Sequence, residues 1–521
     1  MSETNTARIC IPVCEERASG LRAAIERAAP LADLVELRLD YLQGSELFKA
    51  MSNLPALINA CPRPVVVTLR PVEQGGRREM DNLTRIIFWG EHFLYGKSYI
   101  DFADIELDLA LFFRQREQDE KKQLLDWDRV ICSHHDFAGV PADLEKIYER
   151  MATTPARILK IAVGAHDATD CLPVFRLLER ARLDGRELIA LAMNEAGVAT
   201  RILGPSRGAF MTYGAPDVGP SSAPGQASAR DLRELYRVDR LDGQTQIMGL
   251  VGSPVTHSIS PQLHNAAFAA LGINAVYIPF EVRDAGEFIR RMAHPRSREA
   301  GLSLRGLSVT APHKSAVMEH LDQVETAALE IGAVNTILIK DGELRGSNTD
   351  AAALIAPLLE KGLSLQKARC AVIGAGGAAR SALWSLRRAG AQVTLLARDE
   401  EKAHHVVEKL GGDCRKLDGA SFSGYDLVVN ATPLGTHGLA EEETPALAGQ
   451  LRGVSLVYDL VYNPAETRFM REAVEAGSDC IGGLGMLVAQ AAAQFKLWTG
   501  RDAPLDVMKE AAGRALAGWA G

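Results

Sequence analysis

The first 230 residues or so repeat one pattern, in which short apolar runs alternate with longer stretches of helical character. The eight runs are RICIPV, LVELRL, VVVTLR, ADIELDL, RVICSH, RILKIAV, ELIALAM and AFMTYG. Their spacing of roughly 20–35 residues is that of parallel strands joined by crossover helices. The pattern therefore predicts a (β/α)8 barrel, whose catalytic groups would lie at the carboxyl ends of the strands. An open doubly wound sheet is the alternative.

The second run carries charges at every other position. Side chains alternate between the two faces of a strand, and helices cover the outside of a barrel, so the charged set should face inward. The apolar set is Val35, Leu37 and Leu39, and the charged set is Glu36, Arg38 and Asp40. Charges inside a barrel are costly unless they pair or bind something polar. The run thus favours a polar ligand site, with a solvated edge strand as the alternative.

Composition limits the class of partner. A chain of 521 residues should hold at least two domains, and its net charge of -8 implies neither a nucleic acid nor an anionic membrane as partner. We find no apolar run long enough to span a membrane and no secretory signal in MSETNTARICIPV. Eight scattered cysteines without a CxxC pair favour reduced thiols, and hence the cytoplasm. Small-molecule substrates are the partners we expect.

The pattern changes after the eighth run. DLRELYRVDRL is expected to form the last barrel helix, and LDGQTQ the linker that follows. QIMGLVG, AVYIPFEV, GLSVTAP and the hairpin AVNTILIKDGELRGSNTD predict a smaller α/β domain, and CAVIGAGGAAR opens a nucleotide-binding pattern. We predict a barrel at 1–240, an α/β domain at 246–350 completed by helices at 485–521, and a Rossmann-like domain at 351–484.

Two candidate catalytic residues lie on neighbouring predicted strands. His135 ends the fifth run and Lys160 lies within the sixth. Adjacent strands are about 4.8 Å apart, so inward side chains from both could meet over one ligand. Burial favours the neutral amine that a Schiff-base nucleophile requires, although a lysine can also simply cap a strand end. His134 and His135 should point to opposite faces of the strand and share no metal ion, so we predict no metal site.

Residues 7–238 resemble the type I 3-dehydroquinate dehydratases. The motifs ELRLD, TLRP, SHHDF, ILKIAV, GVATRIL and SAPGQAS occur in that order. The resemblance implies that Lys160 forms an imine with the C3 ketone of 3-dehydroquinate. It implies that His135 then removes a C2 proton and helps water to leave, giving 3-dehydroshikimate. The implied substrate-binding residues are Glu36, Arg38, Arg70, Arg201, Ser222 and Gln226.

One position departs from that family. Relatives usually carry glutamate where Gln74 stands, with Glu73 directly before it. If that carboxylate normally holds the histidine in its working state, dehydratase turnover depends on this loop. A slip of one residue would let Glu73 serve instead.

The second half offers a different set of polar residues. Ser258 and Ser260 stand at a predicted helix start near Pro261, where free amides favour an anion, although serine there is more often only a cap. Lys314 is expected at or near another helix start, whose positive end would ease proton loss and suit a general acid/base.

Residues 246–520 resemble the shikimate dehydrogenases. The shared features are the serine pair, the VTAPHK lysine, the VNT asparagine, NTD, GAGGAAR, NATPLG and GMLVAQAA. The resemblance implies that Lys314 and Asp350 form the catalytic pair. It implies that the substrate is bound by Ser258, Ser260, Thr310, Asn335 and Gln490. Ser308 replaces an asparagine that is common in bacterial members.

The loop GAGGAA follows a predicted strand and opens a helix, the context in which backbone amides hold a dinucleotide pyrophosphate. Arg398 and Lys402, at the end of the next strand, suit the 2′-phosphate of NADP. Asp399 keeps NAD open, because a carboxylate can accept a hydrogen bond from a free 2′-hydroxyl, or it can simply cap the helix. The expected cofactor residues are Gly374, Gly376, Gly377, Ala378, Arg398, Lys402 and Thr432.

The two resemblances interlock, since the product of the barrel reaction carries the ketone that the second half would reduce. Together they imply a bifunctional enzyme of the shikimate pathway, a lyase fused to an NADP-dependent oxidoreductase, as a monomer or homodimer. The alternative is an NAD-dependent quinate/shikimate dehydrogenase fused to an inactive barrel that serves as a binding or scaffold domain.

Overall fold

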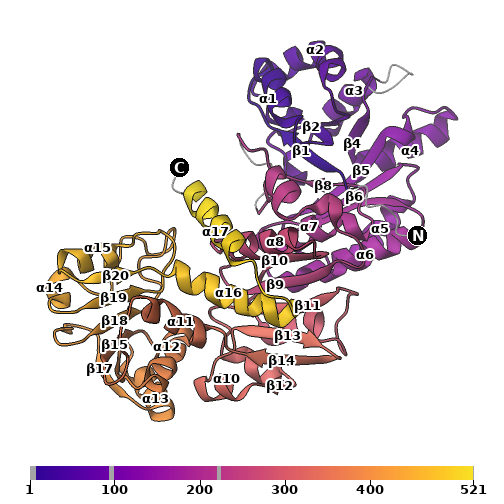
Figure 1. Cartoon of the computed structure of the whole chain (residues 1–521). Helices are drawn as coiled ribbons and strands as arrows, with labels where there is room; N and C mark the ends of the chain where they lie inside the picture. Colours follow the sequence, from indigo (N-terminus) through magenta and orange to yellow (C-terminus); the bar gives the residue numbers. More distant parts are fainter. Residues whose placement is uncertain (1–6, 93–98, 220–224, 520–521) are drawn as a thin grey trace. The chain divides into compact units, whose positions relative to one another are not determined.

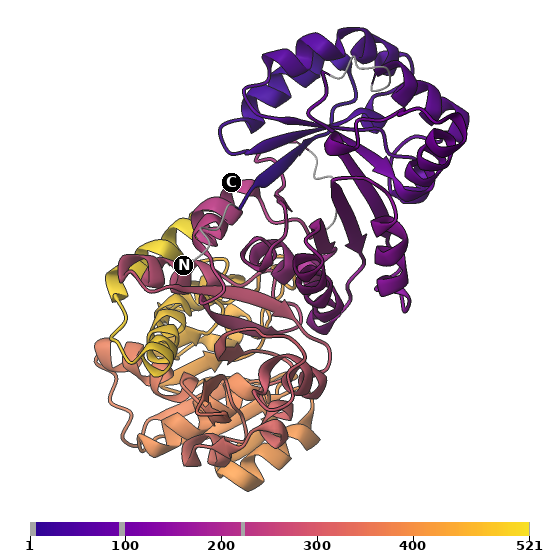
Figure 2. The same ribbon diagram turned by 90° about the vertical axis from the view of Figure 1, so that its right-hand side faces the viewer.

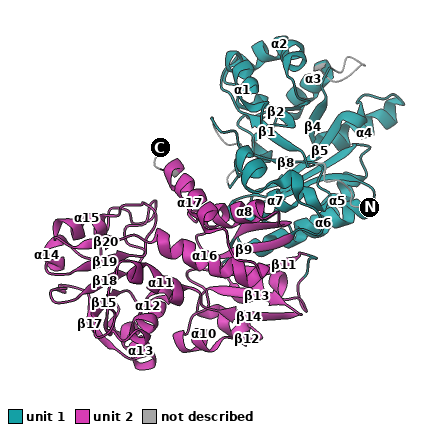
Figure 3. Ribbon diagram, viewed as in Figure 1, with its two compact units in different colours: residues 1–245, 280–282, 299–301 teal, residues 246–279, 283–298, 302–521 magenta. Residues whose placement is uncertain are grey.

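The computed structural model describes residues 7–92, 99–219 and 225–519 (Figure 1). The chain divides into two compact units, of which the first comprises residues 1–245, 280–282 and 299–301 (Figure 3). The second comprises residues 246–279, 283–298 and 302–521. Within the described ranges, no helix combines the length and the apolar character that crossing a membrane requires.

The first unit contains a parallel sheet of eight strands. They are β1 (Ile9–Val13), β2 (Leu34–Arg38), β3 (Val65–Thr68), β4 (Phe102–Glu106), β5 (Val130–Asp136), β6 (Ile158–Val163), β7 (Glu187–Ala192) and β8 (Thr212–Tyr213). Consecutive strands from β1 to β7 pair in parallel, and β1 pairs with β8. A bridge between Leu188 and Ala209 joins β7 to the segment before β8. The predicted barrel is confirmed, and the open sheet is wrong.

Helices connect these strands and lie outside them, as Figure 2 shows from a second direction. They are α1 (Leu21–Ala28), α2 (Glu46–Ala60), α3 (Asn82–His92), α4 (Leu107–Glu120), α5 (Leu144–Ala152), α6 (Cys171–Leu183) and α7 (Val198–Leu203). The predicted last barrel helix is shorter than expected. Asp231–Leu235 (η8) form a π-helical turn and Val238–Arg240 (η9) a 3₁₀ turn, because Arg237 between them adopts a left-handed conformation with φ of 51°.

The second unit begins with a mixed sheet. Its strands are β9 (Gln246–Gly252), β10 (Ala275–Glu281), β11 (Leu304–Val309), β12 (Gln323–Val324), β13 (Thr336–Lys340) and β14 (Glu343–Ser347), in the order β10-β9-β11-β13-β14-β12. The predicted hairpin is the antiparallel pair β13 and β14. The helices of this region are α8 (Ser260–Ala270), α9 (Ala285–Phe288), α10 (Thr326–Ile331), α16 (Leu484–Thr499) and α17 (Leu505–Trp519).

The C-terminal helices belong to the core of this mixed sheet. Phe495 and Trp498 of α16 and Met508 of α17 pack in one buried cluster with Leu263 and Phe268 of α8. Burying such large apolar side chains is the main stabilising contribution available to this region.

The rest of the second unit is a parallel sheet of six strands. They are β15 (Arg369–Ile373), β16 (Gln392–Ala397), β17 (Asp413–Lys416), β18 (Leu427–Asn430), β19 (Leu456–Asp459) and β20 (Asp479–Ile481), in the order β17-β16-β15-β18-β19-β20. The helices are α11 (Asp350–Glu360), α12 (Gly377–Arg388), α13 (Glu400–Leu410), α14 (Ala448–Leu451) and α15 (Arg468–Glu475). The strand order reverses between β15 and β18, where such sheets bind ligands. The Rossmann-like fold is confirmed.

Candidate active sites

The barrel holds one pocket in which seven of the eight residues predicted for it come together. The seven are Glu36, Arg38, Arg70, His135, Lys160, Arg201 and Gln226. The eighth, Ser222, lies outside the described residues. The seven come from several strands and from the loops and the helix that follow strands, as expected for a site at the carboxyl ends of barrel strands.

Lys160 is the most enclosed amine of this pocket. It lies on β6, directly opposite Ser133 of β5, and only 5% of it is exposed. Its Nζ donates to Asp104 Oδ2 at 2.8 Å and to the hydroxyl of Tyr213 at 2.9 Å, and lies 3.7 Å from Glu36 Oε1. The dry surroundings expected from the sequence are thus accompanied by a carboxylate counter-ion.

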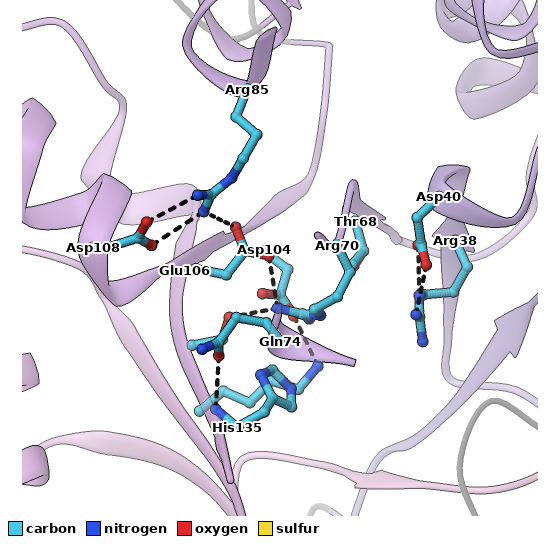
Figure 4. Close-up of polar contacts among 12 residues, drawn as sticks. Arg38, Asp40, Thr68, Arg70, Gln74, Arg85, Asp104, Glu106, Asp108 and His135 are labelled. Atoms are coloured by element: carbon cyan, nitrogen blue, oxygen red, sulfur yellow. Dashed lines mark hydrogen bonds and ion pairs between the residues drawn. The ribbon is translucent and has the colours of Figure 1, made fainter. Parts of the chain in front are cut away.

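Buried charges form a network around Asp104, the carboxylate that accepts from this lysine (Figure 4). Arg70 donates to Asp104 at 2.7 Å, to Glu106 at 2.9 Å and to Ser133 at 2.8 Å, and Arg85 donates to Glu106 at 2.6 Å. Burial alone would raise the pKa of Asp104, but Arg70 and Lys160 together lower it well below its ordinary range. Asp104 is therefore an anion held between two cations.

The sequence analysis missed Asp104 and Glu106. They alternate with Ala103 and Ile105 in the run ADIELDL, just as the charges alternate in the second run. The same period-two argument would have placed both carboxylates inside the barrel.

His135 faces the same pocket, and its backbone N–H donates to Oε1 of Gln74 at 3.0 Å (Figure 4). Glu73 is exposed, so the contact with the histidine is made by Gln74 and the predicted slip of the loop is not seen. The imidazole Nδ1 is buried without a hydrogen-bond partner among the described residues. Burial, reinforced by Arg70 and Lys160, lowers the pKa of His135 well below 6.5. The ring is therefore neutral and able to take a proton.

The three arginines differ in their freedom to bind a ligand. Arg38 forms two hydrogen bonds with Asp40, at 2.9 and 2.8 Å, and Arg70 is held by the network described above. Arg201 on α7 is only 1% exposed, and its Nε and Nη2 have no hydrogen-bond partner among the described residues. Burial lowers the pKa of Arg201 to about 10. A buried cation without a partner marks the place for an anionic group.

The second unit holds a larger pocket of about 380 Å³. It is lined by nine of the predicted residues: Ser258, Ser260, Thr310, Lys314, Asn335, Asp350, Ala378, Thr432 and Gln490. Lys314 Nζ donates to Asp350 Oδ2 at 2.6 Å, and Asn335 Nδ2 donates to Asp350 Oδ1 at 2.7 Å. The carboxylate is thus fixed on both oxygens, and it orients the ammonium toward the pocket.

Lys314 lies near a helix start, as expected, but that helix is only a short 3₁₀ helix. The residue lies in a turn, two positions before the short 3₁₀ helix Ala316–His320 (η11). Its carbonyl accepts from the backbone N–H of Val334 at 2.7 Å, so it begins no local helical ladder. A five-residue 3₁₀ helix offers little dipole. The group that orients the Lys314 side chain is therefore the carboxylate of Asp350.

A chain of hydrogen bonds along the pocket wall includes Tyr277 and Gln494, which were not predicted from the sequence. The hydroxyl of Tyr277 donates to Ser308 Oγ at 2.8 Å, Ser308 Oγ donates to Gln494 Oε1 at 2.8 Å, and Gln494 Nε2 donates to the carbonyl of Asn335 at 3.1 Å. Gln494 follows Gln490 by four residues, which places both on one face of α16. That spacing was the available signal.

The cofactor loop leaves room for a dinucleotide. Gly374 has φ of 122°, which a residue with a side chain rarely adopts. A Cβ at Gly376, which caps α12, would meet no atom within 4 Å, so open space lies at the free amides of that helix. The described residues therefore fit a pyrophosphate.

The ribose end of the cofactor site lies at the start of α13. Arg398 is exposed there, and the Oδ1 of Asp399 accepts from the backbone N–H of Lys402 at 2.9 Å. Asp399 is thus the cap of α13, one of the roles left open by the sequence.

Comparison with known proteins gives matches over most of the chain. Type I 3-dehydroquinases match residues 9–242, and the shikimate dehydrogenase substrate-binding domain matches residues 250–337. An NAD(P)-binding family matches residues 362–469, and the shikimate 5′-dehydrogenase C-terminal domain matches residues 483–512.

Individual relatives cover one or both parts. A bifunctional 3-dehydroquinate dehydratase/shikimate dehydrogenase of Arabidopsis thaliana, described as chloroplastic, is 34% identical over 96% of this chain and 84% of its own. A shikimate dehydrogenase (NADP(+)) of Methanopyrus kandleri is 40% identical over 52% of this chain and 96% of its own. A solved structure, the dehydroquinate dehydratase and shikimate dehydrogenase of S. pombe, is 26% identical, covers 98% of each chain and has a TM-score of 0.42.

Proposed function

The chain belongs to the family of bifunctional 3-dehydroquinate dehydratase/shikimate dehydrogenases, and from this premise we propose how its residues divide the two reactions. The barrel dehydrates 3-dehydroquinate to 3-dehydroshikimate through a lysine Schiff base. The second unit reduces 3-dehydroshikimate to shikimate with NADPH.

In the dehydratase, Arg201 binds the substrate carboxylate. The supporting observation is that this arginine is buried in the pocket that holds Lys160, and that its Nε and Nη2 have no hydrogen-bond partner in the described part of the chain. Lys160 attacks the C3 ketone, and the imine withdraws electrons from C2 so that the neutral His135 can remove a C2 proton. His135 then returns the proton to the C1 hydroxyl, which leaves as water.

The remaining barrel residues position these groups. Glu36, Arg38 and Gln226 face the substrate hydroxyls, and we keep Ser222 as a further contact. Arg70 donates hydrogen bonds to Asp104, Glu106 and Ser133. It therefore holds Asp104, the carboxylate that pairs with Lys160, in place.

In the reductase, Lys314 gives a proton to the C3 oxygen, and Asp350 holds the lysine in place. The carboxylate and hydroxyls of the substrate bind to Ser258, Ser260, Thr310, Asn335 and Gln490. When bound, NADPH supplies a hydride to C3. Gly374, Gly376, Gly377 and Ala378 would hold its pyrophosphate, with Thr432 lining the pocket, and Arg398 and Lys402 would bind its 2′-phosphate.

A coupled assay from 3-dehydroquinate with NADPH tests both assignments. We expect Lys160→Ala to abolish the first step and its borohydride-trapped adduct, while reduction of added 3-dehydroshikimate continues. Lys314→Ala should abolish the reduction of 3-dehydroshikimate, while the dehydration of 3-dehydroquinate and the borohydride-trapped adduct remain. Lys146→Ala and Lys361→Ala, on exposed surfaces of the two units, serve as matched controls. If wild-type protein forms no adduct with 3-dehydroquinate, the barrel is a binding or scaffold domain instead.

Three further assignments are part of the proposal. We divide the chain into domains at 1–240, 246–350 with 485–521, and 351–484, which the packing of α16 and α17 on α8 supports. We place the protein in the cytoplasm, since its eight cysteines are free, and cell fractionation tests this. We expect a monomer or homodimer, which light scattering distinguishes.

A further inference from the structure

Tyr213 has no role in the reactions described so far, although it touches the lysine of the barrel. It lies on β8, lines the same pocket and is 5% exposed. Its hydroxyl is 2.9 Å from Lys160 Nζ, and its ring centroid is 4.4 Å from that nitrogen. One residue therefore contacts the nucleophile through both its hydroxyl and its ring.

The contacts of Lys160 define a direction of attack. Once the Lys160 ammonium has lost one proton to solvent, the neutral amine has two N–H bonds and one lone pair in a tetrahedral arrangement. Asp104 Oδ2 at 2.8 Å and the Tyr213 hydroxyl at 2.9 Å are both able to accept one N–H bond. With both N–H bonds held, the lone pair is the only position left for a ligand in the pocket. Without the hydroxyl, one N–H bond loses its acceptor and the amine is free to rotate.

The phenol also keeps its own proton. Burial, with the negative charge of Glu36, raises the pKa of Tyr213 well above 10. The oxygen can therefore accept from the lysine while the O–H remains available to donate. A group that accepts from one atom and donates to another is able to pass a proton between them.

We propose that Tyr213 is a catalytic residue of the dehydratase, which orients the Lys160 amine and passes a proton from nitrogen to oxygen while the imine forms. The proposal rests on the dehydratase function assigned above.

Atoms and charge are conserved when Lys160 adds to the ketone. The lone pair of Nζ forms the C–N bond, and the electron pair of the C=O π bond moves to oxygen. The O–H of Tyr213 gives its proton to that oxygen, and the phenol oxygen takes a proton from the new N⁺H₂ group. One proton has moved from nitrogen to oxygen, the carbinolamine is neutral, and Tyr213 is unchanged. The reverse path serves hydrolysis of the product imine.

The first test is Tyr213→Phe, which keeps the ring and removes the hydroxyl. In single-turnover experiments quenched with borohydride, we expect the adduct on Lys160 to form about 100-fold more slowly, the lower range of general acid–base effects. Reduction of 3-dehydroshikimate by the second unit is the internal control and should keep its wild-type rate. Tyr148→Phe is the matched control, because Tyr148 is buried in the same unit and donates to Asp184, away from the pocket.

The outcomes separate the two levels of the proposal. A wild-type rate of adduct formation in Tyr213→Phe overturns the role of Tyr213 and leaves the dehydratase intact. No adduct in wild-type protein overturns the dehydratase itself.

A second variant covers the case in which Tyr213→Phe does not fold. 3-Fluorotyrosine at position 213 keeps the hydroxyl and makes it more acidic. A proton relay changes the rate of adduct formation in this variant, whereas an unchanged rate overturns the proposal.

Discussion

Arg201→Met should stabilise the empty barrel while abolishing its affinity for substrate. Burial lowers the pKa of Arg201 from 12.5 to about 10. At about 1.4 kcal/mol for each pKa unit, the charged side chain destabilises the ligand-free unit by about 3 kcal/mol. The folded-state pKa is the lower one, so this penalty is fully present at neutral pH and disappears only as the pH rises from about 10 toward 12.5. Imperfect packing of methionine costs roughly 1.5 kcal/mol, which leaves a net gain of about 1.5 kcal/mol.

Hydrogen exchange measured by mass spectrometry on the barrel strands reports the stability of the first unit separately. We expect roughly tenfold slower exchange of the most protected amides in Arg201→Met, and loss of the extra protection that 3-dehydroshikimate gives to the wild-type protein.

Arg38→Met is the matched control, and it should destabilise the first unit rather than stabilise it. Asp40 would lose both of its hydrogen bonds to Arg38 and remain buried, which should cost about 3–5 kcal/mol. If Arg201→Met instead speeds exchange as Arg38→Met does, the assignment of Arg201 as an unpaired cation kept for the substrate is refuted.

Three further predictions concern pH, cofactor and proton transfer. Because His135 acts as a neutral base with a lowered pKa, dehydratase kcat should stay on its plateau well below pH 6.5. Gln74→Glu should shift the acidic limb of the pH–rate profile, where kcat begins to fall, to higher pH. An acidic limb that does not shift contradicts the role of Gln74. Asp399→Asn keeps the cap of α13 and removes a charge near the 2′-phosphate, so KM for NADPH should fall by about 3–10-fold, and a rise would contradict this. Asn335→Ala releases one oxygen of Asp350 and should lower reductase kcat by about 10²-fold, with dehydratase rates as the control.

The barrel and its polar interior could be predicted because their signals are local. The alternation of Glu36 and Arg38 with apolar neighbours depends only on the period of a strand. Lys160 and His135 lie on neighbouring strands, with His135 two residues beyond the partner of Lys160, and consecutive strands of a barrel are adjacent. The fold class of the barrel followed from such patterns, whereas most residues of the two pockets were given by the family resemblances.

Pairing between distant residues could not be predicted. The contact of Lys160 with Asp104 spans 56 positions and depends on which side chains meet across the barrel. The same holds for the arginines, since the sequence does not tell that Arg38 and Arg70 pair with carboxylates while Nε and Nη2 of Arg201 find no partner among residues 7–92, 99–219 and 225–519. The contact of Lys314 with Asp350 spans 36 positions, and it followed only from the family resemblance.

The position of Asp104 beneath Lys160 has a consequence for the whole dehydratase cycle. An ammonium group and a protonated imine carry the same single positive charge at nearly the same place. The anion that balances one therefore balances the other, with Arg70 holding it still. The same fixed carboxylate therefore balances the resting ammonium and the protonated imine, so little dipolar reorganisation separates these two charged states of the cycle.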